Sequence, residues 1–258
     1  MGVQTREVGP SCRVSPVSAP QTARSDYRVV VLDDHALFAE SLELALSVEQ
    51  YTAIRSEPPR AGTSARVVVQ NVLKHRPDVV LLDLHLGDFG DSDALIHPLA
   101  EAGANVVIVS STLDAARLGG CIQRGARAIV SKDRRLNEIL AVVRRLRTGL
   151  PVLSLEERES LVEAWRRDRQ EHEVALARLE LLSNREREVL ADLMAGRSVR
   201  EIAERKVVSE GTVRTQVKAV LAKLEVGSQL AAVGLAHRVG WRPPGDPADR
   251  AGTGEGSG

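Results

Sequence analysis

The sequence of 258 residues lacks the features of several protein classes. No apolar run approaches the roughly 18–20 residues that a membrane-spanning helix needs, and no apolar stretch near the N-terminus suggests a secretory signal. Two cysteines, Cys12 and Cys121, exclude a disulfide scaffold and a cysteine-rich zinc site. Aromatic residues make up only 2%, too few for a platform that stacks single-stranded nucleic acid. We therefore expect a soluble, cytoplasmic globular protein without membrane contact.

Net charge is also absent, but the balance is uneven along the chain. The sequence has 35 Lys and Arg residues and 35 Asp and Glu residues. Residues 27–151 carry 15 of each kind, whereas residues 183–242 carry 11 basic and 7 acidic residues, a net charge of +4. A neutral block followed by a basic block indicates one domain for a small or protein partner and one for an anionic polymer.

The region 27–151 alternates short Val/Leu runs with amphipathic stretches of helical length, whereas 1–26 and 243–258 are predicted to be disordered tails. This alternation predicts an α/β fold with a doubly wound, flavodoxin-like sheet of five parallel strands. We predict strands at Arg28–Leu32, Thr52–Arg55, Asp78–Leu82, Asn105–Val109 and Ala128–Val130. We predict helices at Ala36–Val48, Ala65–His75, Asp91–Ala102, Asp114–Arg124 and Leu136–Arg147.

Residues 152–182 are predicted to form a helical linker, because 154–182 hold no Gly or Pro and many strong helix formers. An interrupted apolar stripe runs along it: Leu155, Leu161, Val162, Trp165, Val174, Leu176 and Leu179. The stripe either packs against a neighbouring domain of the same chain or dimerises as a helix pair, and the sequence favours neither interpretation.

Residues 183–242 are predicted to be an all-α domain of four short helices. Two capping boxes, Ser183 with Glu186 and Ser198 with Glu201, begin the first two helices. Ser209 and Ser228 are candidate caps of the other two.

Chemically active side chains follow the core strands of the predicted sheet. Asp33 and Asp34 end the first strand, Asp83 the third, Ser110 the fourth, and Lys132 follows the fifth. Because ligands of open parallel sheets bind at the carboxyl ends of the strands, these groups should converge. Clustered carboxylates invite a hard cation such as Mg²⁺, and an Asp beside it can attack a phosphoryl donor. One strand-end Asp would be an ordinary loop residue, but the whole set indicates phosphoryl chemistry.

Two other interpretations of these strands fail on spacing. A dinucleotide-binding domain needs a G-x-G-x-x-G turn after the first strand, where this chain has DDHALF. A phosphatase of the haloacid dehalogenase type needs an Asp two residues after the nucleophile, where this chain has His85. The six histidines show no metal-ligand spacing, and we expect them to be surface or core residues.

Residues 27–150 resemble the receiver domain of bacterial response regulators. The resemblance implies that Asp83 accepts a phosphoryl group from a sensor histidine kinase. It also implies that Mg²⁺ is bound by Asp34, Asp83, the backbone carbonyl of His85 and, through water, Asp33. Ser110 matches the switch hydroxyl, and Lys132 matches the lysine that pairs with the phosphoryl group.

The chain departs from the receiver pattern at two places. Ile129 stands where the family usually has an aromatic switch residue. The loop after the acceptor holds Leu86 and Gly87 instead of Met-Pro, and its next glycine, Gly90, comes one place early. Both departures concern how the signal is transmitted and leave the groups that the phosphoryl chemistry needs.

The stretch Val199–Lys206, a two-residue turn and Ser209–Leu224 have the lengths of a helix–turn–helix. In the longer helix an apolar stripe should face the bundle, while Arg214, Thr215 and Lys218 lie on another face that suits the DNA major groove. REREVL, EIA and SEGTV make residues 182–233 similar to the LuxR-type DNA-binding domain. This resemblance implies DNA contacts by Arg214, Thr215 and Lys218, and it places Thr212 at the helix start or on a phosphate. It also implies that the last helix, from Ser228, is a dimerisation helix. The chain departs from the LuxR-type pattern at Gln216, where many members have His.

Together the two resemblances, over about 185 residues, identify the chain as a member of the NarL/FixJ class of response regulators. They imply a non-enzymatic, cytoplasmic, phosphorylation-controlled regulator of transcription that binds double-stranded DNA. Mg²⁺, a histidine kinase, RNA polymerase and a second copy of the chain are its implied partners. Two alternatives are a regulator that binds DNA without phosphorylation and a receiver that acts mainly by docking protein partners.

Overall fold

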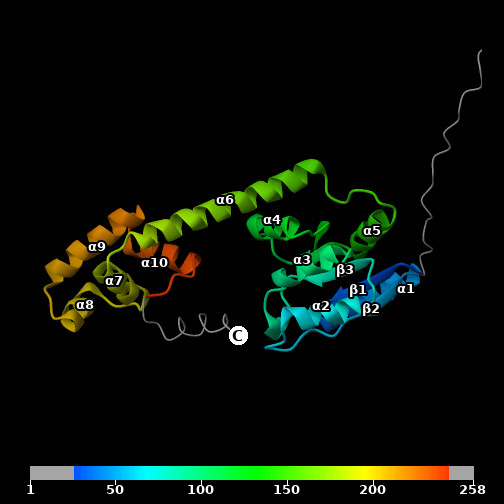
Figure 1. The fold of residues 1–258 in the computed structure, drawn as a ribbon, viewed down its shortest axis with the longest axis horizontal. Coiled ribbons are helices and arrows are strands. Elements are labelled where there is room, and N and C mark those ends of the chain that lie inside the picture. Colours follow the sequence, from blue (N-terminus) through cyan, green and yellow to red (C-terminus); the bar gives the residue numbers. More distant parts are fainter. Residues whose placement is uncertain (1–25, 244–258) are drawn as a thin grey trace, which may run out of the picture. The chain divides into compact units, whose positions relative to one another are not determined.

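The computed structural model describes residues 26–243, so the predicted tails lie outside the described residues except for Asp26 and Pro243. The chain divides into two compact units between Leu161 and Val162. The first unit is an α/β structure and the second is all-helical (Figure 1). The predicted fold class is therefore confirmed.

The first unit is built on five parallel strands in the order β2-β1-β3-β4-β5. The Val/Leu runs of its central strands are buried on both faces, and apolar residues without alternation are typical of such strands. This strand order places the carboxyl ends of β1 and β3 side by side at the switch point of the sheet. The strands are β1 (Arg28–Leu32), β2 (Thr52–Arg55), β3 (Val79–Asp83), β4 (Asn105–Ser110) and β5 (Ala128–Ser131).

Five helices cover this sheet (Figure 1). Helices α1 and α5 share one apolar core with strand residues that include Leu81 and Val109. Right-handed crossovers place α2, α3 and α4 on the opposite face, where Val30, Leu82 and Ile108 are buried. The helices are α1 (Ala36–Val48), α2 (Ala65–Leu73), α3 (Asp93–Glu101), α4 (Ala115–Gln123) and α5 (Leu136–Arg147).

Helix α3 begins at Asp93, two residues later than predicted, because the loop after β3 uses the two preceding residues. Asp91 forms a single antiparallel bridge with His85. The hydroxyl of Ser92, a fully buried side chain, donates to the backbone carbonyl of Asp83 at 2.5 Å. A short 3-10 helix, η2 (Gly87–Phe89), lies within the same loop.

Helix α6 (Leu155–Glu180) contains most of the predicted linker. Its apolar stripe is only partly buried, because Leu155, Val174 and Leu176 are exposed. Ala175 and Leu179 pack into the core of the second unit, together with residues of the helices that follow. Packing within the chain therefore accounts for the C-terminal part of the stripe, and dimerisation through α6 stays a prediction.

The second unit also contains four shorter helices: α7 (Asn184–Met194), α8 (Val199–Lys206), α9 (Glu210–Leu224) and α10 (Gln229–Arg238). Both predicted capping boxes are present at the starts of α7 and α8. Ser209 and Ser228 accept backbone hydrogen bonds from the first turns of α9 and α10.

The turn between α8 and α9 contains a strained residue. Val207 has a φ of 53° and its side chain is 90% exposed. A β-branched residue rarely adopts this left-handed conformation, because its side chain crowds the backbone. The turn therefore has its sharp geometry without the glycine that would favour it.

Candidate functional site

The predicted acidic groups converge at the carboxyl edge of the sheet. One ligand atom from each of Asp33, Asp34, His35 and Asp83 lies within 4.8 Å of the others. Asp33 and Asp83 are buried, whereas Asp34 is partly exposed. The sheet order explains the convergence, because β1 and β3 are hydrogen-bonded neighbours.

Lys132 follows β5 and reaches across the edge to two of these carboxylates. Its ammonium nitrogen lies 2.6 Å from Asp83 Oδ2 and 2.8 Å from Asp33 Oδ2. Burial alone would lower the pKa of Lys132, but hydrogen bonds to Asp33 and Asp83 outweigh it and raise the pKa. Lys132 is therefore a charged partner of both carboxylates.

The carboxyl of Asp83 has a pKa above its ordinary value. Burial is the largest cause, and the nearby charge of Asp33 adds to it. The hydrogen bond from Lys132 acts in the opposite direction and offsets part of the rise. A buried carboxylate next to one cation and another carboxylate is a group whose charge would be stabilised by a further cation.

The donor set and its surroundings fit a small divalent cation. Asp34 Oδ1 is buried and accepts no hydrogen bond, although it lies 2.8 Å from His35 Nδ1. A Cβ atom at Gly87 would come within 3.3 Å of Asp34 Oδ2, so a larger residue would crowd this side of the site. Carboxylate oxygens are the ligands that Mg²⁺ prefers. The predicted carbonyl ligand belongs to His85, whose amide faces Asp83 Oδ1 at 3.4 Å.

Ser110 ends β4 on the same edge and is buried. Its Oγ accepts a hydrogen bond from the amide of Thr112 at 3.1 Å. The amide of Lys132 donates to the backbone carbonyl of Ser110 at 3.0 Å, which ties the two predicted phosphoryl-contacting residues together. Ile129, at the position of the usual aromatic residue, is partly buried in β5.

Sequence reasoning misses two residues of this edge. His35 lies among the acidic groups, and its adjacency to Asp33 and Asp34 is the signal that could have found it. Ser92 holds the carbonyl of Asp83 from nine residues away. No spacing rule predicts that contact, because it depends on how the intervening loop folds.

In the second unit, helix α9 presents a polar face opposite its buried stripe. Arg214, Thr215 and Lys218 are exposed, whereas Val213 and Val217 are buried. The Arg214 guanidinium pairs with the carboxylate one turn earlier on α9 at 2.7 Å, and the Thr215 hydroxyl donates to a backbone carbonyl of the preceding turn at 3.0 Å. Both contacts are exposed, so a competing anion can replace them at small cost.

The fourth predicted DNA-contact residue, Thr212, lines a separate groove. This groove has a volume of about 320 Å³ and is lined by Arg185, Glu188, Lys206, Val208, Thr212 and Gln216. Gln216 Oε1 is buried there and has no hydrogen-bond partner. Thr212 also contacts Ser209 Oγ through its hydroxyl at 2.9 Å, consistent with a place at the helix start.

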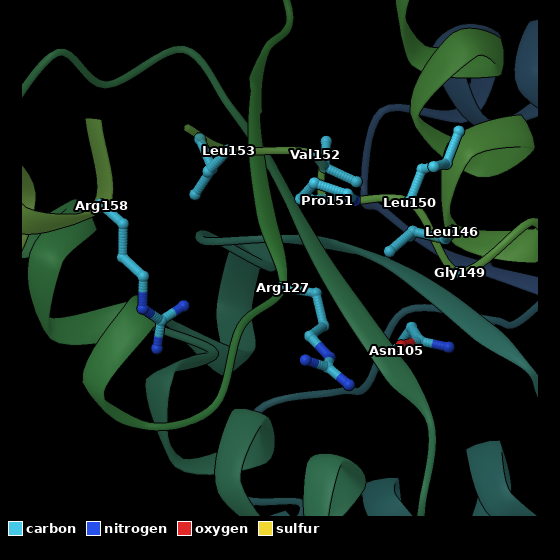
Figure 2. Close-up of a pocket in the computed structure, with 9 residues that line it drawn as sticks. All are labelled: Asn105, Arg127, Leu146, Gly149, Leu150, Pro151, Val152, Leu153 and Arg158. Carbon is cyan, nitrogen blue, oxygen red and sulfur yellow. The ribbon is translucent and has the colours of Figure 1, made fainter. Parts of the chain in front are cut away.

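A further pocket of about 350 Å³ lies in the first unit, away from the acidic edge. Figure 2 shows Arg127 and Arg158 together with the segment Gly149–Leu153 that follows α5. None of the predicted site residues lines it.

Among residues 26–243, no single helix is long and apolar enough to cross a membrane, and the bent pair α9–α10 passes that test only jointly.

Two protein-family models match separate regions of the chain. Residues 29–144 match the model of the response regulator receiver domain, and residues 180–236 match that of the luxR family of bacterial regulatory proteins. The chain is 31% identical over 223 residues to the probable transcriptional regulatory protein NarL of Mycobacterium tuberculosis, a match that covers 86% of this chain and 98% of that protein.

Two other matches are more distant. The transcriptional regulatory protein DegU of Brevibacillus brevis is 26% identical over 235 residues, covering 86% of this chain and 97% of that protein. A solved structure of the response regulator RcsB with DNA is 21% identical, with a TM-score of 0.44, and covers 83% of this chain and 98% of that one. On the family models and the NarL relative, the chain belongs to the NarL/FixJ-type two-component response regulators, a family of DNA-binding transcriptional regulators.

Proposed function

We propose that Asp83 accepts a phosphoryl group from a sensor histidine kinase and that this step controls DNA binding by the second unit. The observation that supports it most directly is the contact of Lys132 with Asp83 at 2.6 Å, inside a cluster of carboxylates. A partly buried lysine in this place can pair with a phosphoryl group that forms on the same carboxylate.

The transfer makes one bond and breaks one. A carboxylate oxygen of Asp83 attacks phosphorus, and the bond from phosphorus to the kinase histidine nitrogen breaks with its electron pair on that nitrogen. Lys132 then pairs with the phosphoryl oxygens, and the hydroxyl of Ser110 donates to one of them. Asp34, Asp83, the His85 carbonyl and, through water, Asp33 would hold Mg²⁺, which when bound neutralises charge on the phosphoryl group. The chain turns over no other substrate in this proposal.

The phosphoryl step can be tested with the full chain, acetyl phosphate and Mg²⁺. We expect intact mass to show the gain of one phosphoryl group in the wild type and none in Asp83→Asn. Asp88→Asn is the matched control, because Asp88 is an exposed acid of the same loop. Lys132→Ala should retain Mg²⁺ binding but accumulate less phosphorylated protein. Phosphorylation of Asp83→Asn would contradict the assignment of the acceptor.

For the second unit, we propose that Arg214, Thr215 and Lys218 contact double-stranded DNA and that Thr212 contacts a phosphate beside the helix start. The exposed, cationic face of α9 supports this placement, because Arg and Lys there can reach base edges and phosphates. A second copy of the chain and RNA polymerase are the further partners in this proposal.

Ile129 favours one alternative, a regulator that binds DNA without phosphorylation. It provides no hydroxyl or ring at the position of the family's aromatic switch. Duplex binding by the wild type, with and without acetyl phosphate, distinguishes the two. Equal affinity under both conditions, in protein whose intact mass includes the phosphoryl group, would favour the alternative.

A further inference from the structure

Arg117, in the first turn of α4, contacts the loop that follows Asp83. One nitrogen of its guanidinium, Nη2, lies 2.5 Å from Asp91 Oδ1 and 3.4 Å from the backbone carbonyl of Leu84. The same nitrogen lies 3.6 Å from Asp93 Oδ2. Arg117 therefore joins α4 to both the beginning and the end of this loop.

The loop in turn holds Asp83. Leu84 follows Asp83 directly, and Asp91 bridges to His85, the predicted carbonyl ligand of the cation. The hydroxyl of Ser92 donates to the carbonyl of Asp83. A displacement of Leu84 therefore acts on the residue next to Asp83. A displacement of Asp91 acts, through the bridge, on His85, two residues after Asp83.

Asp91 is specific to this chain's departure from the receiver pattern. Since Gly90 comes one place early, an aspartate stands where the family has its glycine. Burial would raise the pKa of Asp91, but the hydrogen bond and charge of Arg117 outweigh it and lower the pKa. In this chain the loop therefore makes a charged contact with α4 through Asp91 and Arg117.

A chain of hydrogen bonds leads from the backbone of Arg117 to Ser110. The amide of Arg117 donates to Asp114 Oδ1 at 3.1 Å. The amide of Asp114 donates to Thr112 Oγ1 at 3.3 Å, and the amide of Thr112 donates to Ser110 Oγ at 3.1 Å. If the Ser110 side chain turned toward a phosphoryl group, the Thr112 amide would lose its acceptor. Thr112 also accepts from the amide of Asp114, the residue that caps α4.

We propose that Arg117 is a positioning residue that couples the state of Asp83 to α4, in place of the aromatic switch that Ile129 does not provide. This role rests on the proposed phosphoryl acceptance at Asp83. The guanidinium of Arg117 holds the acceptor loop, and the backbone of the same residue is held by the segment that begins at Ser110. Phosphorylation then changes both ends of this connection at once, and α4 moves with them.

The test uses the full chain with acetyl phosphate and Mg²⁺, and two measurements on each sample. Intact mass gives the phosphorylated fraction, and hydrogen exchange of peptides covering residues 112–124 gives the response of α4. Arg117→Ala removes the contact to the loop, and Thr112→Val breaks the path to Ser110. Arg124→Ala is the control. Arg124 lies at the other end of α4 and pairs with Asp93 at 3.4 Å, as Arg117 does at 3.6 Å, so this variant loses a contact to Asp93 while the contact of Arg117 to Asp91 remains.

We expect phosphorylation to change exchange in residues 112–124 of the wild type and of Arg124→Ala. In Arg117→Ala and Thr112→Val the change should fall by about fivefold, the lower end of typical coupling factors, at a similar phosphorylated fraction. Arg117→Lys keeps one donor for Asp91 and should restore part of the response. If Arg117 only stabilised the fold, its removal would not lower the exchange response of α4 while leaving the phosphorylated fraction unchanged.

Three outcomes would overturn the inference. The first is a full α4 response in Arg117→Ala, and the second is a phosphorylated wild type whose α4 does not respond. The third is an equal loss in Arg124→Ala. A wild type that gains no phosphoryl group would instead contradict the proposed function, so the two failures are distinguishable by mass. If Arg117→Ala does not fold, Thr112→Val and Arg117→Lys decide the question.

Discussion

At the scale of single residues, Asp83 carries a charge that the folded chain holds unfavourably. Its pKa is raised above the ordinary value, chiefly by burial. A raised carboxyl pKa contributes stability below the unfolded pKa, and this contribution is lost as the pH rises through the folded value. At neutral pH and without Mg²⁺, the ionised carboxylate therefore lowers the free energy of unfolding, although the Lys132 ammonium offsets part of this loss.

Asp83→Asn should consequently stabilise the first unit at pH 7 without Mg²⁺. We expect a gain on the order of 1 kcal/mol, a typical size for a single substitution. The gain should shrink as the pH falls through the raised pKa of folded Asp83, and it should be gone below the ordinary carboxyl pKa of about 4, where the folded and unfolded forms are both protonated. Urea unfolding of both proteins at several pH values measures it, with Asp88→Asn as control. A destabilised Asp83→Asn at pH 7 would show that the ion pair with Lys132 outweighs burial.

The sequence is informative about this edge where side chains follow strands, and it is silent where loops bring them together. Asp33, Asp83 and Lys132 were predictable because parallel strands end at one edge. Ser92 was not, because its contact to the Asp83 carbonyl depends on the fold of the loop. The same reason explains why the contact between the Asp91 carboxylate and α4 could not be predicted.

At the scale of elements, α9 separates the predicted DNA contacts into two groups. Arg214, Thr215 and Lys218 lie on the exposed face of the helix, whereas Thr212 lines the groove beside α7 and α8. The amphipathic pattern predicted the buried stripe of α9. It did not predict the groove, since that requires the packing of three helices.

Arg214 and Lys218 should differ in what their removal does. If Arg214 reads a guanine, Arg214→Ala should cost ~1–3 kcal/mol at the cognate site and relax the preference at one base pair. If Lys218 contacts phosphate, Lys218→Ala should weaken cognate and random duplexes alike and lower the salt slope by about one per half-site. Salt titrations on both duplexes measure this, with Arg169→Ala on α6 as control. Unchanged DNA affinity in both variants would mean that α9 does not enter the major groove of DNA.

Val217→Asp should unfold the second unit. Val217 is 4% exposed and packs with Val189 and Ile202, so an aspartate there would be a buried, unpaired charge. We expect a loss of several kcal/mol, at the upper end for single substitutions, which circular dichroism during thermal unfolding would detect. Thr215→Asp, on the exposed face of the same helix, is the control and should leave the melting temperature nearly unchanged. A folded Val217→Asp would place this residue outside the core.

At the scale of the whole molecule, the alternation of apolar runs and amphipathic stretches predicted the first unit, and capping residues and helix lengths predicted the second. The predicted bounds of most elements lie within two residues of those in the structure. The apolar stripe of α6 was less informative. Periodicity placed Val174 and Leu176 in it, yet both are exposed, while Ala175 between them is buried. Periodicity identifies a helix, but the neighbours that cover its face are set by the tertiary packing.

We expect phosphorylation to raise the population of dimers, because recognition helices of this type usually act as two-fold pairs on adjacent half-sites. Leu230 on α10 is 82% exposed and offers an apolar contact for a second copy. Sedimentation velocity with and without acetyl phosphate measures the dimer fraction. Leu230→Asp should reduce it, whereas Leu181→Asp, at another exposed apolar residue, should not. A monomer under all conditions, including on DNA, would count against this assembly.

The left-handed conformation of Val207 makes the turn before α9 a place where the protein can be engineered for heat resistance. A glycine would adopt this backbone without strain, so Val207→Gly should raise the free energy of unfolding by about 1 kcal/mol. Val208→Gly, one residue later, relieves no left-handed backbone and should give no such gain. The comparison of their melting temperatures would show whether a more thermostable regulator is available from one exposed position, with the acidic edge and the cationic face of α9 left intact.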